Sequence, residues 1–77
     1  MPQAFVLINT EVGAEDEVFE QLKRFSQIKE VYLVYGVYDI VARVEADTLD
    51  ELKDIVTWRI RKIDKIKSTL TMLIAEK

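Results

Sequence analysis

The stretch from Val31 to Val44 constrains the fold most, because two runs of β-forming residues meet there at a short joint. The joint is Gly-Val-Tyr-Asp, residues 36–39, where glycine can adopt a positive φ and Asp39 can accept hydrogen bonds from backbone N–H groups. A joint that only reverses the chain is usually polar, with Asn-Gly or Asp-Gly at its centre. Taken alone, the joint favours an ordinary hairpin with a well-packed tip over a small-ligand site on a sheet edge.

Apolar runs along the rest of the chain predict four strands and two helices. The strands are expected over residues 4–8, 28–35, 38–45 and 65–75. The first helix is expected over residues 14–26, because its apolar residues follow the spacing of one helix face. These are Val18, Phe19, Leu22 and Phe25. Acidic residues fill its first turn, and Lys23 and Arg24 its last, as the helix dipole prefers.

The second helix is expected to begin near Asp47 and Thr48, because the segment from Thr48 to Glu51 matches a capping box. Six apolar residues are expected to form its buried stripe. They are Leu49, Leu52, Ile55, Val56, Ile60 and Ile63. Trp58 lies off this stripe, so we expect it to be partly exposed or in contact with another subunit.

The order β-α-β-β-α-β predicts an α+β fold of the ferredoxin-like (split βαβ) kind, as a single domain over residues 1–77. Both helices are expected to cover one face of a four-stranded antiparallel sheet. The first strand is apolar on both sides, however, with Phe5 and Leu7 pointing one way and Val6 and Ile8 the other. Because monomers rarely leave a large apolar patch in water, we expect a dimer packed sheet to sheet. A membrane-facing surface is the weaker alternative.

The composition excludes several kinds of chemistry. The chain has no histidine and no cysteine, so the commonest general base, thiol nucleophiles and the usual zinc sites are missing. The two glycines stand far apart and form no phosphate-binding loop, and we expect no metal and no cofactor. No window is long enough to span a bilayer and the N-terminus lacks the pattern of a signal peptide, so a cytoplasmic protein is expected.

The net charge of −3 argues against a free-standing nucleic-acid binder, which normally carries a basic stripe. One local basic cluster does exist. It consists of Arg59, Arg61, Lys62, Lys65 and Lys67. Most of this cluster falls at the end of the second predicted helix, where cations complement the dipole, and we prefer this structural explanation to a phosphate-binding patch.

A few polar residues remain as candidate ligand contacts. Asp39 lies at the joint beside Tyr35 and Tyr38, while Thr69 and Thr71 stand two apart on the last strand, so that both hydroxyls face the same side. Alternating threonines are common in strands for packing reasons, and that explanation is favoured for the pair alone. Together, a carboxylate, two hydroxyls and backbone N–H groups would suit a zwitterion.

These residues resemble the ligand-binding half of the Lrp/AsnC family, the leucine-responsive and asparagine-synthase regulators, a module also called the RAM domain. The resemblance covers nearly the whole chain and is carried by residues 34–40 (V-Y-G-V-Y-D-I), 50–52 (D-E-L) and 68–71 (S-T-L-T). It implies a ferredoxin-like fold, dimers with facing sheets as in dimeric α+β barrels, closed rings of dimers, and an amino acid or related small effector bound between dimers. The ligand-binding residues that it implies are Tyr35, Gly36, Tyr38, Asp39, Thr69 and Thr71.

Two departures limit what the resemblance implies. Position 37, commonly polar in the family, is Val37 here, a change that can alter the mouth of the pocket or its specificity. The family's N-terminal helix-turn-helix half has no counterpart in this sequence, so the chain resembles stand-alone members and no direct DNA binding is expected. The implied function is an effector-binding domain that assembles with itself and modulates transcription or amino-acid metabolism through partner proteins, with full-length Lrp/AsnC regulators as candidates.

Two other classes of function remain open. Small dimeric α+β barrel enzymes, such as cofactor-free monooxygenases, use a similar order of strands and helices. A purely structural oligomerisation module would share the fold and would bind no small molecule saturably. Turnover of a small aromatic substrate that is lost on Asp39→Ala would indicate the enzyme.

Overall fold

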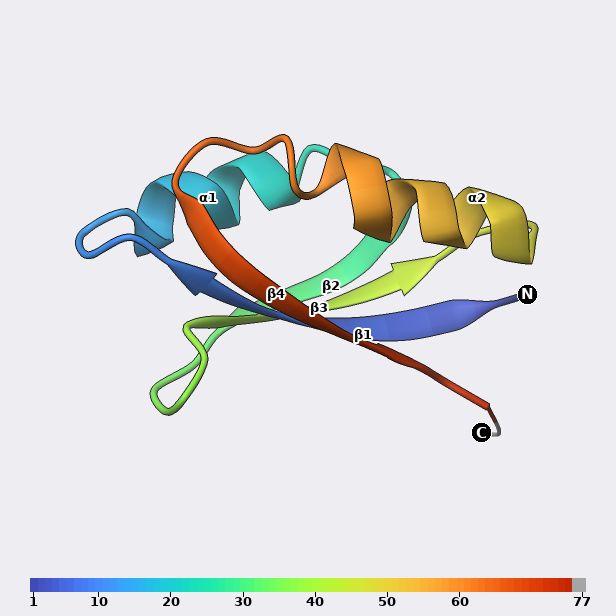
Figure 1. The fold of residues 1–77 in the computed structure, drawn as a ribbon, viewed down its shortest axis with the longest axis horizontal. Coiled ribbons are helices and arrows are strands. Elements are labelled where there is room, and N and C mark those ends of the chain that lie inside the picture. Colours follow the sequence, from blue (N-terminus) through green and yellow to red (C-terminus); the bar gives the residue numbers. More distant parts are fainter. Residues whose placement is uncertain (76–77) are drawn as a thin grey trace.

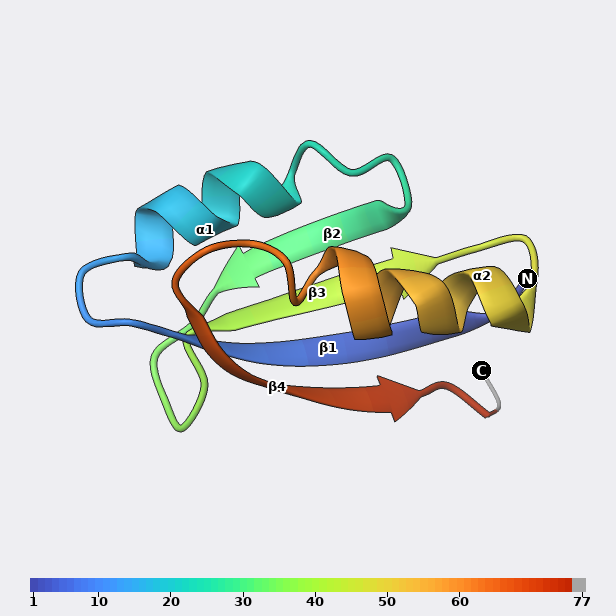
Figure 2. The same cartoon turned by 45° about the horizontal axis from the view of Figure 1, so that its top comes forward.

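The structure, a computed structural model, describes residues 1–75 and confirms the predicted order of strands and helices (Figure 1). The elements are β1 (Gln3–Thr10), α1 (Glu15–Leu22), β2 (Ile28–Leu33), β3 (Ile40–Glu45), α2 (Leu49–Asp54), the π-helical continuation η1 (Ile55–Arg59) and β4 (Ile66–Leu73). The strands form one antiparallel sheet in the order β2-β3-β1-β4, and both helices lie on the same face of it (Figure 2). The ferredoxin-like α+β fold is therefore confirmed.

The core lies between the helices and one face of the two central strands. On β1, Ala4, Val6 and Ile8 are fully buried, and the alternate residues of β3 are buried beside them. Leu22 of α1 and Leu52 of α2 close this layer from above. The period of two along β1 thus puts alternate apolar residues, and not the whole run, into the core.

The first helix is shorter than the sequence predicts. It ends at Leu22, so Lys23 and Arg24 lie in the turn after the helix and not in its last turn. The chain tightens there, because the N–H groups of Arg24 and Phe25 donate to carbonyls three residues earlier, at 3.1 and 3.2 Å. This tightening turns the chain toward β2 while Phe25 still packs against the core.

The second helix begins as predicted and then widens. The Thr48 hydroxyl accepts a hydrogen bond from the N–H of Glu51 at 3.1 Å, which confirms the N-cap. In η1 the N–H of Ile60 donates to the carbonyl of Ile55 at 3.0 Å, five residues back. This wider turn brings Ile55 and Ile60 onto the same buried side, although their spacing of five does not fit a regular α-helix.

Two exposed residues of the second helix bear on its predicted buried stripe, one that was placed in the stripe and one that was placed outside it. Leu49 was expected to be buried but is 46% exposed, because it begins the helix and its turn lies largely in solvent. Trp58 is 60% exposed, as its position off the stripe predicted. The other five residues of the stripe are buried.

The joint between β2 and β3 is a loop over residues 34–39, not a tight turn. β2 ends at Leu33 and β3 begins at Ile40, so each strand is two residues shorter at the joint than predicted. The loop is closed by the Val34 N–H, which donates to the Asp39 carbonyl at 2.9 Å. Gly36 does not have a positive φ; the glycine that does is Gly13, at 83° in the turn before α1. The expected role of Gly36 in a left-handed turn is therefore wrong.

The helix-free face of the sheet carries the second apolar set of β1. Phe5 lies opposite Arg43 and Met72, and Leu7 opposite Val41 and Leu70. Because directly opposed residues of antiparallel strands share a face, all of these side chains lie on the side away from the helices. Within residues 1–75, no helix is long and apolar enough to cross a membrane.

Lys65, just before β4, has a left-handed backbone with φ at 74°. This conformation aims its carbonyl at the N–H of Glu11, 2.9 Å away, while its Nζ lies 3.2 Å from a Glu17 carboxylate oxygen. A side chain in the left-handed region costs about 1–2 kcal/mol, and glycine avoids this cost. We therefore expect Lys65→Gly to raise the free energy of unfolding by about 1 kcal/mol, measured by urea unfolding at fixed protein concentration.

Lys65→Ala is the matched control, because it removes the half-exposed ion pair to Glu17 and keeps the strained backbone with a Cβ atom. It should give no gain in stability. Equal stabilities of the two variants would show that the strain at this position is not released by glycine.

Candidate functional site

The loop over residues 34–39 projects beyond the ends of β2 and β3 (Figures 1 and 2). Tyr35 is fully exposed and Val37 is 86% exposed, whereas Tyr38 is half-buried. The expectation of a well-packed hairpin tip is therefore wrong for Tyr35 and Val37. At Gly36 an added Cβ would meet nothing within 4 Å, so the fold of one copy leaves open space around it.

Asp39 fastens the base of this loop to the end of β1. Its Oδ2 accepts hydrogen bonds from the backbone N–H of Thr10 at 2.9 Å and from the Thr10 hydroxyl at 3.4 Å. Its own N–H donates to the Ile8 carbonyl at 3.0 Å. Thr10 is only 6% exposed, so the carboxylate satisfies a buried donor. Asp39 thus has a structural function that its place in the sequence did not reveal.

A pocket of about 440 Å³ lies between this loop and the start of α1. It is lined by Glu15, Asp16, Leu33, Val34, Tyr35 and Asp39. With several carboxylates and no cation in the lining, this turn pocket suits a positively charged group such as an ammonium ion. Within residues 1–75, no cluster of side chains fits a metal ion.

Four residues that line the turn pocket were not predicted as site residues, and two of them, Glu15 and Asp16, are charged. Glu15 and Asp16 were explained by the dipole of α1, and no spacing in the sequence connects them to a loop some twenty positions later. Of the four predicted site residues in the loop, Tyr35 and Asp39 line the pocket and Gly36 and Tyr38 do not.

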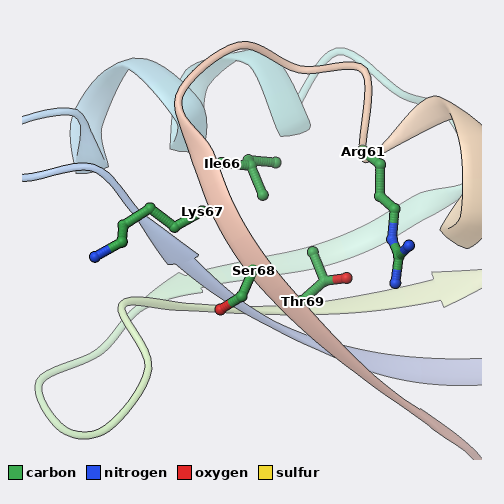
Figure 3. Close-up of a pocket in the computed structure, with 5 residues that line it drawn as sticks. All are labelled: Arg61, Ile66, Lys67, Ser68 and Thr69. Carbon is green, nitrogen blue, oxygen red and sulfur yellow. The ribbon is translucent and has the colours of Figure 1, made fainter.

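Thr69 and Thr71 of β4 share one face of the sheet, as predicted. They lie opposite Ile8 and Val6, so both are on the helix-covered side, and both are partly buried. Thr69 lines a second pocket, of about 400 Å³, between β4 and the segment after η1 (Figure 3). The lining of this edge pocket is Arg61, Ile66, Lys67, Ser68 and Thr69.

The two groups of predicted residues are not brought into one pocket. Asp39 is bonded to Ile8 on one side of β1, and Thr69 lies opposite Ile8 on the other side. Two strand spacings amount to roughly 10 Å between their backbones, and the turn pocket and the edge pocket share no lining residue. Within one copy, a small amino acid is therefore too short to contact both groups.

The family model and the curated relatives that this chain matches point to the same family. Residues 3–77 match the family described as the Lrp/AsnC ligand binding domain. An uncharacterised HTH-type transcriptional regulator of Pyrococcus horikoshii is 32% identical over 71 residues, which are 92% of this chain and 45% of that protein. The chain spans about half the length of several of the curated regulators that it matches.

Two solved structures are similar over nearly their whole length. The crystal structure of FFRP-DM1 is 44% identical with a TM-score of 0.92, and the match covers 96% of this chain and 99% of that one. A hypothetical protein from Pyrococcus horikoshii, PHS023, is 43% identical with a TM-score of 0.91, covering 100% of this chain and 93% of that one.

The Asp39–Thr10 contact leads to a prediction about stability. Asp39→Ala leaves the buried N–H of Thr10 without its acceptor, so the free energy of unfolding should fall by roughly 1–3 kcal/mol. Asp39→Asn keeps a side-chain oxygen at this position and should lose clearly less. Chemical denaturation of both variants measures the difference; an Asp39→Ala protein as stable as the natural one would contradict the structural function.

Proposed function

Because the chain belongs to the Lrp/AsnC family as a ligand-binding domain, we propose that it binds an amino acid or a closely related small effector and modulates transcription through its own assembly and through partner proteins. The match over residues 3–77 is the observation that carries this proposal. Full-length regulators of the family are candidate partners, since the curated relatives are about twice as long and share this half. We further propose that residues 1–77 act as a single domain of a cytoplasmic regulator.

The lining of the turn pocket supports the proposal, because it suits the ammonium group of such an effector. Asp39 reaches it from the loop, and Glu15 and Asp16 reach it from the first turn of α1. The described hydrogen bonds of the Asp39 side chain both use Oδ2, which leaves its other oxygen as the acceptor that we assign to the effector. Tyr35 and Leu33 supply apolar surface for the rest of the ligand.

The separation of the two pockets supports a site completed by a second copy. The loop over residues 34–39 exposes Tyr35 and Val37 to solvent, and Gly36 has open space beside it, so another chain can approach the loop closely. The hydroxyls of Thr69 and Thr71 would then act on an effector held by the loop of a neighbouring copy. Under this proposal the six residues predicted from the sequence act together only in the assembly.

The helix-free face supports a dimer packed sheet to sheet. Tyr32, Leu70 and Met72 are about half exposed there in a single copy, and Phe5 and Leu7 lie between them. Burying such a continuous apolar surface against a second copy removes it from water, which is the main driving force for association.

Polar groups on this face are paired among themselves. Arg43 donates to Glu30 at 2.7 Å and to Gln3 at 2.8 Å, and its Nη1 lies 3.4 Å from Glu45. The hydrogen bond and charge of Glu30 raise the pKa of Arg43, and the same carboxylate raises the pKa of Tyr32, so neither group changes its charge near neutral pH. Charges that are already paired are less costly to cover than isolated ones.

The regulators among the relatives favour a binding function over an enzyme. In a purely structural oligomerisation module, the carboxylate-lined turn pocket would have no ligand. Saturable binding of an amino acid separates the proposed function from the structural one, and the absence of turnover separates it from the enzyme.

The effector proposal is tested by a thermal-shift screen against the amino acids and related metabolites. Ligand at a hundredfold its Kd stabilises the folded state by about 2.7 kcal/mol, which corresponds to a rise in Tm on the order of 10 °C for a small domain. Asp39→Asn should weaken binding at least about tenfold, because it removes the charge that pairs with the ammonium group and keeps the contact to Thr10. Undiminished binding by this variant would place the ammonium group elsewhere.

The dimer proposal is tested by Leu7→Glu, with Leu49→Glu as a matched control. Leu7 lies on the helix-free face, so its replacement places an unpaired charge in the interface and should split the dimer. Leu49 receives the same substitution at an exposed helix start, where an acidic side chain is tolerated. Light scattering measures the mass of each variant. A monodisperse monomer of the natural sequence would refute the proposal.

A further inference from the structure

The edge pocket is lined by an arginine, Arg61, that has no role in the effector proposal. Arg61 lies just after η1, and its exposed side chain lines this pocket. Within residues 1–75, Arg61 makes no described hydrogen bond or ion pair, whereas its neighbour Arg59 lies 3.7 Å from Asp54. The dipole of the helix explains a cation at the end of η1 but does not explain why Arg61 points toward a strand.

Figure 3 shows how the lining of the edge pocket is arranged. Arg61 descends from the segment after η1 toward β4, and the Thr69 hydroxyl points toward it. Lys67 and Ser68 extend to the other side of β4 in this view, and Ser68 accepts a hydrogen bond from Asn9 at 3.4 Å. Arg61 and Thr69 are therefore the two polar side chains directed into the same space.

The register of β4 adds a backbone donor at this place. The Ile74 N–H donates to the Gln3 carbonyl at 2.9 Å, so every second residue of β4 bonds to β1. By this alternation the N–H groups of Thr69 and Thr71 point away from β1, toward the free edge of the sheet. A guanidinium and a hydroxyl thus line the edge pocket, beside a strand N–H that is directed to the free edge of the sheet.

We propose that Arg61 binds the carboxylate of the effector, with the Thr69 hydroxyl and the Thr69 backbone N–H as its other donors. The two oxygens of a carboxylate match the parallel N–H groups of a guanidinium, and this geometry selects a carboxylate over a single-atom anion. Ile66 forms the apolar wall beside them. The edge pocket then binds the carboxylate of the effector, and the turn pocket of a neighbouring copy binds its ammonium group.

This inference rests on the proposed function for the identity of the effector, but the carboxylate site can be tested without it. The first probe is sodium acetate, added to the labelled full chain while proton–nitrogen spectra report the Thr69 amide and the Arg61 Nε–H. Sodium chloride at equal ionic strength and inorganic phosphate are the comparison titrations. We expect saturable shifts at these two groups with acetate and none with chloride.

Arg61→Gln should abolish the acetate shifts, whereas Lys62→Gln, which removes the same charge one residue later and outside the pocket, should keep them. Thr69→Val should weaken them, and Thr69→Ser should restore them. Diffuse shifts, equal shifts in Arg61→Gln, or saturation by phosphate but not by acetate would each overturn the carboxylate site.

The second probe is whichever amino acid gives the largest thermal shift, compared with its carboxamide, which keeps the ammonium group and lacks the carboxylate. Arg61→Gln should weaken binding of the amino acid at least about tenfold and should leave the carboxamide unaffected. Equal effects on both compounds, or none on either, would overturn the inference while the effector proposal stands. If acetate saturates at Arg61 and no amino acid binds, the anion site stands and the proposed effector fails.

Discussion

The double pairing of β1 is the constraint on which the rest of the structure depends. This strand is bonded to β3 on one side and to β4 on the other, and it is apolar on both faces. One face, with Val6 and Ile8, is buried under the helices, which fixes where α1 and the α2–η1 helix must lie. The other face, with Phe5 and Leu7, has no helix to cover it, and a second copy is the partner that we propose.

The same strand sets the distance between the two pockets. Ile8 lies between one lining residue of each pocket, since Asp39 of the loop over residues 34–39 is bonded to it on one side and Thr69 of β4 lies opposite it on the other. A small zwitterion is too short to span two strand spacings. If the site works as proposed, effector binding therefore requires contact between copies, and by linkage the effector then stabilises the assembled state.

Asp39 connects the fold to the proposed site. Its Oδ2 holds the end of β1 through Thr10, and its loop carries the exposed Tyr35 and Val37. A ligand that engages the same carboxylate would act directly on the anchor of a loop that we place against another copy. Such a coupling needs no long-range pathway, because the ligand contact and the anchor belong to one side chain.

The sequence by itself determined the order of the elements, the alternation of the β1 residues between two faces, the cap at Thr48 and the shared side of Thr69 and Thr71. These features depend on local periodicity and on residues only a few positions apart, so they can be recognised from the chain alone. Their boundaries differ from the predicted ones, as at the end of α1, and the wide turn of η1 was marked only by the spacing of five between Ile55 and Ile60.

Only the tertiary structure decided which charges share a pocket. Glu15 and Asp16 join Asp39, and Arg61 joins Thr69, although nothing in the sequence connects these residues. The tertiary structure also showed that Gly36 has no left-handed backbone, that α1 ends at Leu22, and that β1 separates Asp39 from Thr69. The physical reason is that a pocket forms where the packing of the sheet brings distant segments together, whereas periodicity reports only the neighbours along one element.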